Sequence, residues 1–308
     1  MASANPAFNN PAFQDPRAVK SYPGGPQAAG IGGPTQYAST AHAGVDAAAN
    51  AQLEGAFAAP PAGAVETGRM TVEDTVLKTL GLFVVLLVGA VAGWIWTMAP
   101  VSVQNPNPSI APWLIGALGG FVLAMVVAFT SRKKVRPALI FGYAAFEGLF
   151  VGGISAYFEF LWPGIVVQAT VATVAVVGVT LALFASGKVR ATKRATKVFM
   201  IAMVGYLVFA LINVVMMMFG AFSGPDSAGP FGIYSVKVFG IPLGLIIGVL
   251  VVIMAAYSLV LDFDSIQQGV RNGAPRQYGW VGGFGIMVTV VWLYIEILRI
   301  LAILRGSN

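Results

Sequence analysis

The chain has 308 residues, of which 57% are hydrophobic and only 10% are charged, and its formal net charge is +6. A soluble domain carries about 25% charged residues, so this composition excludes an ordinary soluble protein and indicates an integral membrane protein. In such a protein the positive charge is interpreted loop by loop, and it predicts no nucleic-acid partner. The chain has no cysteine and one histidine, His42, so its apolar part offers no thiolate and no imidazole.

Residues 1–70 differ in composition from the rest of the chain. They are rich in Ala, Gly, Pro, Asn and Gln, and they repeat Asn-Pro-Ala-Phe at 5–8 and 10–13. Such a segment buries too little apolar area to offset its ordering entropy, so we predict a disordered tail. It lacks the basic and apolar regions of a signal peptide. We interpret the repeat as low complexity, with a docking motif as the alternative, and assign residues 71–308 to the membrane domain.

Seven apolar stretches follow the tail, each close to the ~20 residues that a helix needs to cross a membrane. They predict an all-α fold, a polytopic membrane protein with seven transmembrane helices. Pro242 is expected to kink the sixth helix near its outer end, and glycine pairs four residues apart, such as Gly148/Gly152 and Gly244/Gly248, predict close helix packing. The stretches lie at 76–99, 110–130, 137–158, 164–186, 197–221, 238–262 and 281–304.

The loops predict the orientation of these helices. Alternate loops, near 100–109, 159–163 and 222–236, contain no Lys or Arg, whereas the loops between them are basic. By the positive-inside rule the basic loops lie in the cytoplasm. The N-terminal tail is then cytoplasmic, and the C-terminus lies outside. The basic residues are Arg132, Lys133, Lys134, Arg136, Lys188, Arg190, Lys193, Arg194, Lys197, Arg271 and Arg276.

Two carboxylates lie deep inside predicted spans. A charged side chain at the bilayer centre costs roughly 2.5–3.5 kcal/mol on insertion scales, so it usually indicates a functional site. Glu296 lies about two-thirds along the seventh span, where Arg299, on the same helix face, is an alternative, purely structural partner. Glu147 lies ~15 Å into the third span from Pro137. It is either functional or a protonated acid hydrogen-bonded to a neighbour.

Asp262 and Asp264 stand where the sixth predicted span ends. Two residues apart on a helix, they point about 160° away from each other, so one is expected to face the bundle and the other water or headgroups. Carboxylates that are close together in a low-dielectric site cannot all be ionised, so one holds a proton or a cation replaces it. Ca²⁺ prefers such carboxylate and carbonyl oxygens. These residues therefore predict a proton-versus-cation switch.

The sequence contains no HExxH, no phosphate-binding Gly-rich loop followed by Lys-Ser/Thr and no GxSxG. We therefore expect no enzyme and no bound cofactor, apart from Ca²⁺ as a transported ion. An intramembrane hydrolase would lack a recognisable catalytic set.

Three motifs resemble a known family. The first, at 146–155, is FEGLFVGGIS, which resembles the EGL-x-x-G-x-IS stretch of bacterial members of the Bax inhibitor family. The second, LDFDSIQ at 261–267, resembles the family's sixth-helix ending, and LYIEILRIL at 293–301 resembles its last-helix motif, Leu-Tyr-Leu-Asp followed by Leu-Leu-Arg. The resemblance covers about residues 70–308.

The resemblance implies a bundle whose last helix is central, and a pH-dependent Ca²⁺ leak through the bacterial plasma membrane. In the family, two carboxylates on helices six and seven are proposed to share a proton. By motif these are Asp264 and Glu296 here, and Glu147 would line the path. Asp262 and Arg299 are further candidates. Asp264 and Glu296 are more residues apart than is usual in the family, so Glu147 is the alternative partner. The alternative function is a membrane scaffold that binds a membrane protein, regulating a protease or a stress or cell-death response.

Overall fold

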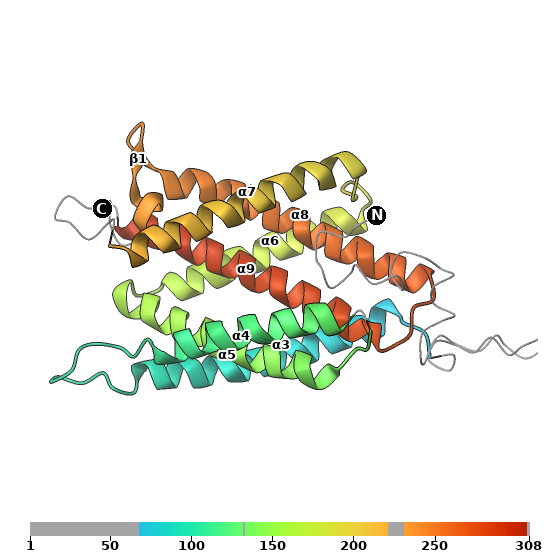
Figure 1. The fold of residues 1–308 in the computed structure, drawn as a ribbon, viewed down its shortest axis with the longest axis horizontal. Helices are drawn as coiled ribbons and strands as arrows, with labels where there is room; N and C mark the ends of the chain where they lie inside the picture. Colours follow the sequence, from blue (N-terminus) through green and yellow to red (C-terminus); the bar gives the residue numbers. More distant parts are fainter. Residues whose placement is uncertain (1–67, 132, 221–230, 307–308) are drawn as a thin grey trace, which may run out of the picture.

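The structure, a computed structural model, describes residues 68–131, 133–220 and 231–306. Nearly all of the tail predicted for 1–70 lies outside the described residues. Within them, seven helices are long and apolar enough to cross a membrane, and they run side by side between two ends of a bundle (Figure 1). They are α3 (Val72–Met98), α4 (Ala111–Thr130), α5 (Pro137–Leu161), α6 (Ile165–Ala185), α7 (Lys193–Met218), α8 (Leu243–Arg271) and α9 (Tyr278–Gly306).

The seven predicted spans are confirmed, but the sixth was placed wrongly at both ends. The helix α8 does not end at Asp262 and Asp264. It continues to Arg271, about two turns beyond Asp264, and these last turns are polar but still helical. The helix is capped by Asn272. The next residue, Gly273, has a positive φ of 69°, the left-handed conformation that glycine accepts readily and that commonly ends a helix.

The start of α8 also differs from the prediction. Pro242 precedes the helix, so it does not kink it. It belongs instead to a hairpin of two short strands, β1 (Lys237–Val238) and β2 (Ile241–Pro242), which follows the 3₁₀ turn η3 (Gly232–Ser235). The hairpin turns at Phe239 and Gly240, which both have positive φ, and two such residues define the tight turn that suits paired strands.

The predicted close packing at glycines is confirmed between α3 and α5. A Cβ on Gly152 would overlap the backbone of Ala90, and a Cβ on Gly148 would overlap the carbonyl oxygen of Leu86. Contact at this distance is available only to glycine, and close backbone approach is what stabilises helix pairs in a membrane, where burial of apolar area adds little. Close backbone contact at these glycines therefore determines how α3 packs against α5.

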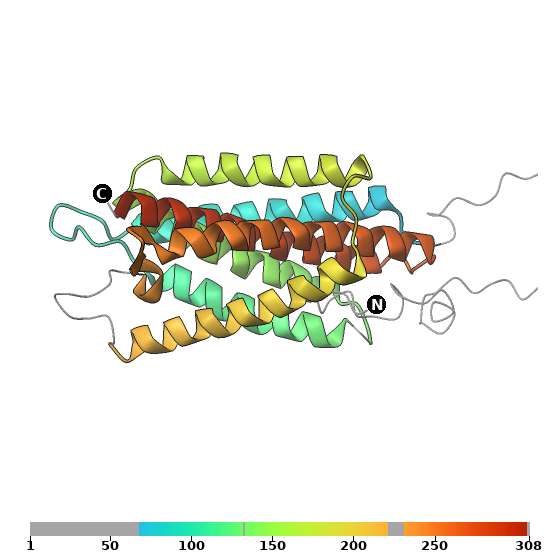
Figure 2. The ribbon, with the colours of Figure 1, turned by 90° about the horizontal axis from the view of Figure 1, so that it is seen from above.

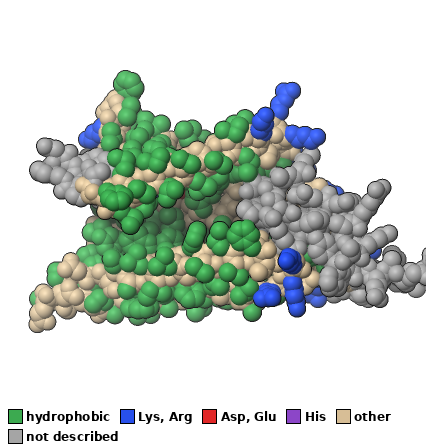
Figure 3. Space-filling model, in the orientation of Figure 1, with side chains coloured by type: hydrophobic (Ala, Val, Ile, Leu, Met, Phe, Trp, Pro, Cys, Tyr) green, Lys and Arg blue, Asp and Glu red, His purple; other side chains and the backbone are tan. Residues whose placement is uncertain are grey.

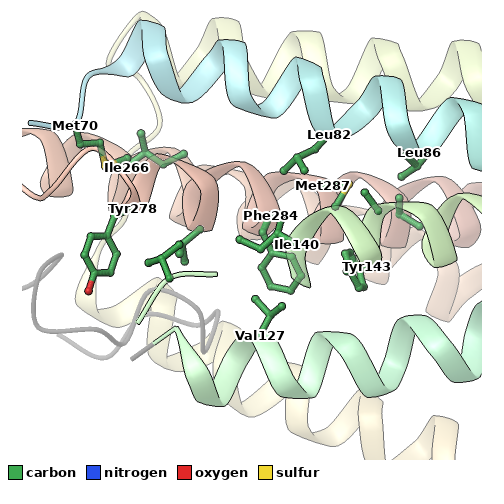
Figure 4. Packing of buried hydrophobic residues seen from close by; sticks show 14 of the residues in the cluster. Met70, Leu82, Leu86, Val127, Ile140, Tyr143, Ile266, Tyr278, Phe284 and Met287 are labelled. Carbon is green, nitrogen blue, oxygen red and sulfur yellow. The ribbon is translucent and has the colours of Figure 1, made fainter. Parts of the chain in front are cut away.

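The helix α9 is central, as the family resemblance implied. It packs against α3, α5, α6 and α8, and half of its most apolar window is buried, against 11% for α7. Two clusters of buried apolar side chains meet on it. Figure 4 shows the first, in which Phe284 and Met287 of α9 lie among side chains of α3, α4 and α5. The second cluster joins α9 to α5, α6 and α8.

The peripheral helices lie on two sides of this centre. Figure 2 shows α3 and α6 on one side of the bundle and α4 and α7 on the other. Figure 3 shows that the α4 and α7 side is covered by hydrophobic side chains and hollowed between the two helices, and that most of the visible Lys and Arg side chains gather at one end. This basic end holds the start of α3 and the α4–α5, α6–α7 and α8–α9 connections.

Candidate functional site

The contact between α8 and α9 buries one carboxylate near the basic end. Asp262 has no exposed surface, and its Oδ2 accepts a hydrogen bond of 2.6 Å from the hydroxyl of Thr289 on α9. The Thr289 hydroxyl lies 3.5 Å from that of Ser258, one turn before Asp262 on α8. Three oxygen-bearing side chains thus meet inside the contact between the two helices.

Glu296 forms a second buried polar cluster, nearer the other end of α9. Its side chain is 3% exposed and pairs with Arg299, one turn further along the same helix. Tyr206 of α7 donates a hydrogen bond of 3.2 Å to its other oxygen. The guanidinium of Arg299 also lies 3.8 Å from the ring centroid of Tyr234 in η3, which is a cation–π distance. This Glu296 cluster therefore joins α9 to α7 and η3.

The two clusters lie at different depths. Thr289, which bonds Asp262, and Glu296 are seven residues apart on α9, which is about 10 Å along the helix axis. Asp264 is two residues closer to the α8–α9 loop than Asp262 and is partly exposed. The structure therefore does not bring Asp264 to Glu296, and it turns Asp262, not Asp264, toward the central helix.

Glu147 lies on a different side of the bundle. Its carboxylate faces α4, where a Cβ on Gly120 would lie 2.9 Å from Oε2, and it interacts electrostatically with Tyr143, one turn earlier on α5. The ring of Tyr143 packs edge-on against Phe284 of α9, with centroids 4.9 Å apart. Glu147 is therefore linked to α9 through Tyr143, and no contact among the described residues joins it to Glu296.

A fourth polar cluster, at the basic end, was not anticipated from the sequence. Asp74 pairs with Lys78 one turn later, and its Oδ1 accepts a bond of 2.8 Å from Arg276 in the α8–α9 connection. Lys78 also donates to the carbonyl oxygen of Arg276 at 2.7 Å. Hydrogen bonding to the carboxylate raises the pKa of Arg276 above its ordinary value. The i, i+4 spacing of Asp74 and Lys78 was the available sequence signal.

The other missed residues are uncharged partners of the acids. Sequence reasoning singled out carboxylates by their charge, but Thr289, Tyr206 and Tyr234 carry no signal of that kind. Only the packing of α7, α8 and η3 on α9 assigns them to a site. The described residues contain no group of three His, Cys, Asp or Glu side chains that could hold a metal ion. A cation at Asp262 or Glu296 would therefore also need hydroxyl, carbonyl or water oxygens.

Comparison with known proteins yields one finding. A protein-family model described as Bax inhibitor 1 like matches residues 5–306, nearly the whole chain. The match begins well before the first span, and so includes most of the N-terminal segment. A search of curated proteins and a search of solved structures each found no match.

Proposed function

Because the chain belongs to the Bax inhibitor 1 like family, we propose that it is a proton-dependent Ca²⁺ leak of the bacterial plasma membrane. The observation that carries the proposal is the pair of buried carboxylates, Asp262 and Glu296, on two adjacent membrane-spanning helices. Ionisable groups at such depth are costly and commonly mark an ion or proton pathway. No enzyme activity is part of the proposal.

The orientation follows from the charges at the two ends. Four basic residues, Lys133, Lys134, Lys188 and Arg190, belong to connections at one end of the bundle, and Arg271 ends α8 at the same end. By the positive-inside rule this end is cytoplasmic. The chain before α3 is then cytoplasmic and the end of α9 lies outside, so Asp262 is the inner carboxylate and Glu296 the outer one.

The two carboxylates have different partners and therefore different roles. Asp262, with the hydroxyls of Thr289 and Ser258, offers oxygen atoms of the kind that Ca²⁺ accepts as ligands. Glu296 already holds an internal cation, Arg299, which would compete with Ca²⁺ for the same carboxylate. In this scheme protons and Arg299 control access at the outer position, and Asp262 binds the ion on its way to the cytoplasm.

This scheme replaces the proton-sharing pair Asp264 and Glu296 that the family resemblance implied. Those residues are nine helix positions apart in depth, counting two on α8 and seven on α9, or roughly 13 Å. Sharing one proton would require the helices to slide past each other by that amount. The arrangement in the structure supports Asp262 as the acid of α8.

Calcium flux into proteoliposomes tests this proposal. The purified chain is reconstituted with a calcium indicator inside the vesicles, and flux is measured over a range of pH for the wild type, Asp262→Asn, Glu296→Gln and Asp264→Asn. We expect each of the first two variants to change the flux by about tenfold, equivalent to about 1.4 kcal/mol in the barrier, and to flatten its pH dependence. Asp264→Asn is the matched control on the same helix and should behave as the wild type.

Two results would contradict the scheme. Unchanged flux in both Asp262→Asn and Glu296→Gln would exclude these carboxylates from the pathway. Loss of flux in Asp264→Asn alone would restore the family pair. Deleting residues 1–67 separates the leak from a scaffold that acts through its N-terminal segment, because this deletion keeps Met70, which packs in the core, and a leak formed by the helices should survive it.

A further inference from the structure

We propose that a groove between α3 and α6 binds one acyl chain of a phospholipid. The groove has a volume of about 740 Å³ and is lined by α3, α5, α6 and α9, a size typical of ligand sites. Its rims are exposed: Leu87 and Val91 of α3 are 61% and 60% exposed, and Val174 of α6 is 65% exposed. Its floor is buried, with Ser155 of α5 and Val291 of α9 at 4% and 5%.

The packing of the helices leaves this groove open toward the membrane. The helix α3 packs mainly on α5 and α9, whereas α6 packs mainly on α9 and α8. The two helices therefore stand on the same side of the bundle without closing on each other (Figure 2). The medium beside them is bilayer hydrocarbon, because both are apolar enough to span a membrane. A chain can enter sideways from the bilayer.

Most hydroxyl groups in the lining already bond within the protein, which favours a hydrocarbon ligand. The Ser155 and Tyr294 hydroxyls bond each other at 2.6 Å across the floor. Thr170 and Thr173 each donate to the carbonyl oxygen four residues earlier in α6, at 2.8 and 2.7 Å. Three of these four hydroxyls therefore donate within the protein, the fourth being whichever of Ser155 and Tyr294 accepts, and the other lining side chains are almost all aliphatic or aromatic. A polar ligand or a permeating ion would lose its hydration here and find at most a few hydroxyl groups in its place.

The length of the groove matches one leaflet. Along α3 the lining runs from Phe83 to Ile95, and along α6 from Val166 to Val174, which correspond to about 18 and 12 Å. Half of a ~30 Å hydrocarbon core is about 15 Å. The groove starts near the end opposite the basic loops, where Trp94 adds an indole group at the depth of lipid esters and headgroups. It thus fits one chain of a lipid from that leaflet.

Native mass spectrometry of the full chain in detergent micelles tests the proposal, with dioleoylphosphatidylglycerol as the added lipid. We expect the wild type to retain one phospholipid per chain. Val174→Trp on one rim and Val91→Trp on the other should each lower this occupancy about tenfold by filling the groove. Both positions face the membrane, so neither substitution overpacks the core. Val179→Trp, on α6 but outside the lining and 60% exposed, is the matched control and should retain the lipid.

Each outcome decides the question. Loss of the lipid in both rim variants, with retention in Val179→Trp, supports the groove. Equal retention in all four proteins assigns the lipid to the general membrane-facing surface and overturns the proposal. Retention of a free fatty acid by the wild type in place of the phospholipid also overturns it, and the bound mass distinguishes the two. Because calcium flux is not the readout, failure here is separate from failure of the leak.

Discussion

The pair of Glu296 and Arg299 makes a quantitative prediction about stability. The Glu296 side chain is buried, at 3% exposure, the Arg299 side chain is mostly buried, at 16%, and each neutralises the other. Removing one partner of a buried pair leaves an uncompensated charge and typically costs about 3–5 kcal/mol, whereas replacing both by uncharged groups is often nearly neutral. We therefore expect Glu296→Gln and Arg299→Met to be strongly coupled.

The contacts that remain after each single substitution indicate where its cost lies between about 3 and 5 kcal/mol. Glu296→Gln leaves Arg299 partly exposed and still stacked on Tyr234, a contact worth about 0.5–2 kcal/mol, so its cost should lie near 3 kcal/mol. Arg299→Met leaves the almost fully buried Glu296 with Tyr206 as its hydrogen-bond donor, so its cost should lie near 5 kcal/mol. The double variant should lie within about 1.5 kcal/mol of the wild type.

Unfolding in mixed micelles of a nonionic detergent and sodium dodecyl sulfate, followed by far-ultraviolet circular dichroism, measures this cycle. The two single costs sum to about 8 kcal/mol, so a double variant within about 1.5 kcal/mol of the wild type gives a coupling energy of roughly 6.5–9.5 kcal/mol. Arg299→Met combined with Asp264→Asn is the control, and those two costs should add within about 0.5 kcal/mol because the residues share no contact among the described interactions. Additive costs for Glu296 and Arg299 would refute the buried pair.

Two further predictions concern helix packing. Gly152→Ala should destabilise the bundle by about 1–3 kcal/mol or more, because its Cβ would overlap the Ala90 backbone, whereas Gly178→Ala, with open space around it, should be neutral in the same unfolding assay. Asn213→Ala should cost about 1–3 kcal/mol, because the Asn213 side chain accepts a 2.7 Å bond from the amide of Ile233 and that amide would lose its partner. Equal effects of the two glycine variants, or a neutral Asn213 variant, would contradict this packing.

The sequence predicted the seven helices because each must cover the hydrocarbon thickness with apolar residues, a one-dimensional constraint. The same constraint failed at α8, because the polar last turns after Asp264 are helical without being apolar. It failed also at Pro242, where local turn geometry, and not span length, decides the boundary.

The sequence also determined which residues are anomalous. Glu147 and Glu296 stand out wherever the helices pack, since a carboxylate at that depth needs a partner. Helix periodicity further required Asp262 and Asp264 to face different ways. Which of the two faces the centre was not visible, because the rotation of α8 depends on the shapes that meet α9.

Tertiary structure alone decided the partners. Thr289 reaches Asp262 and Tyr206 reaches Glu296 only because particular helix faces meet. The groove between α3 and α6 is likewise a property of helices that do not close on each other. Within a membrane all outer faces are similarly apolar, so hydrophobic pattern cannot say which helix meets which; close-fitting glycines and buried polar contacts decide it.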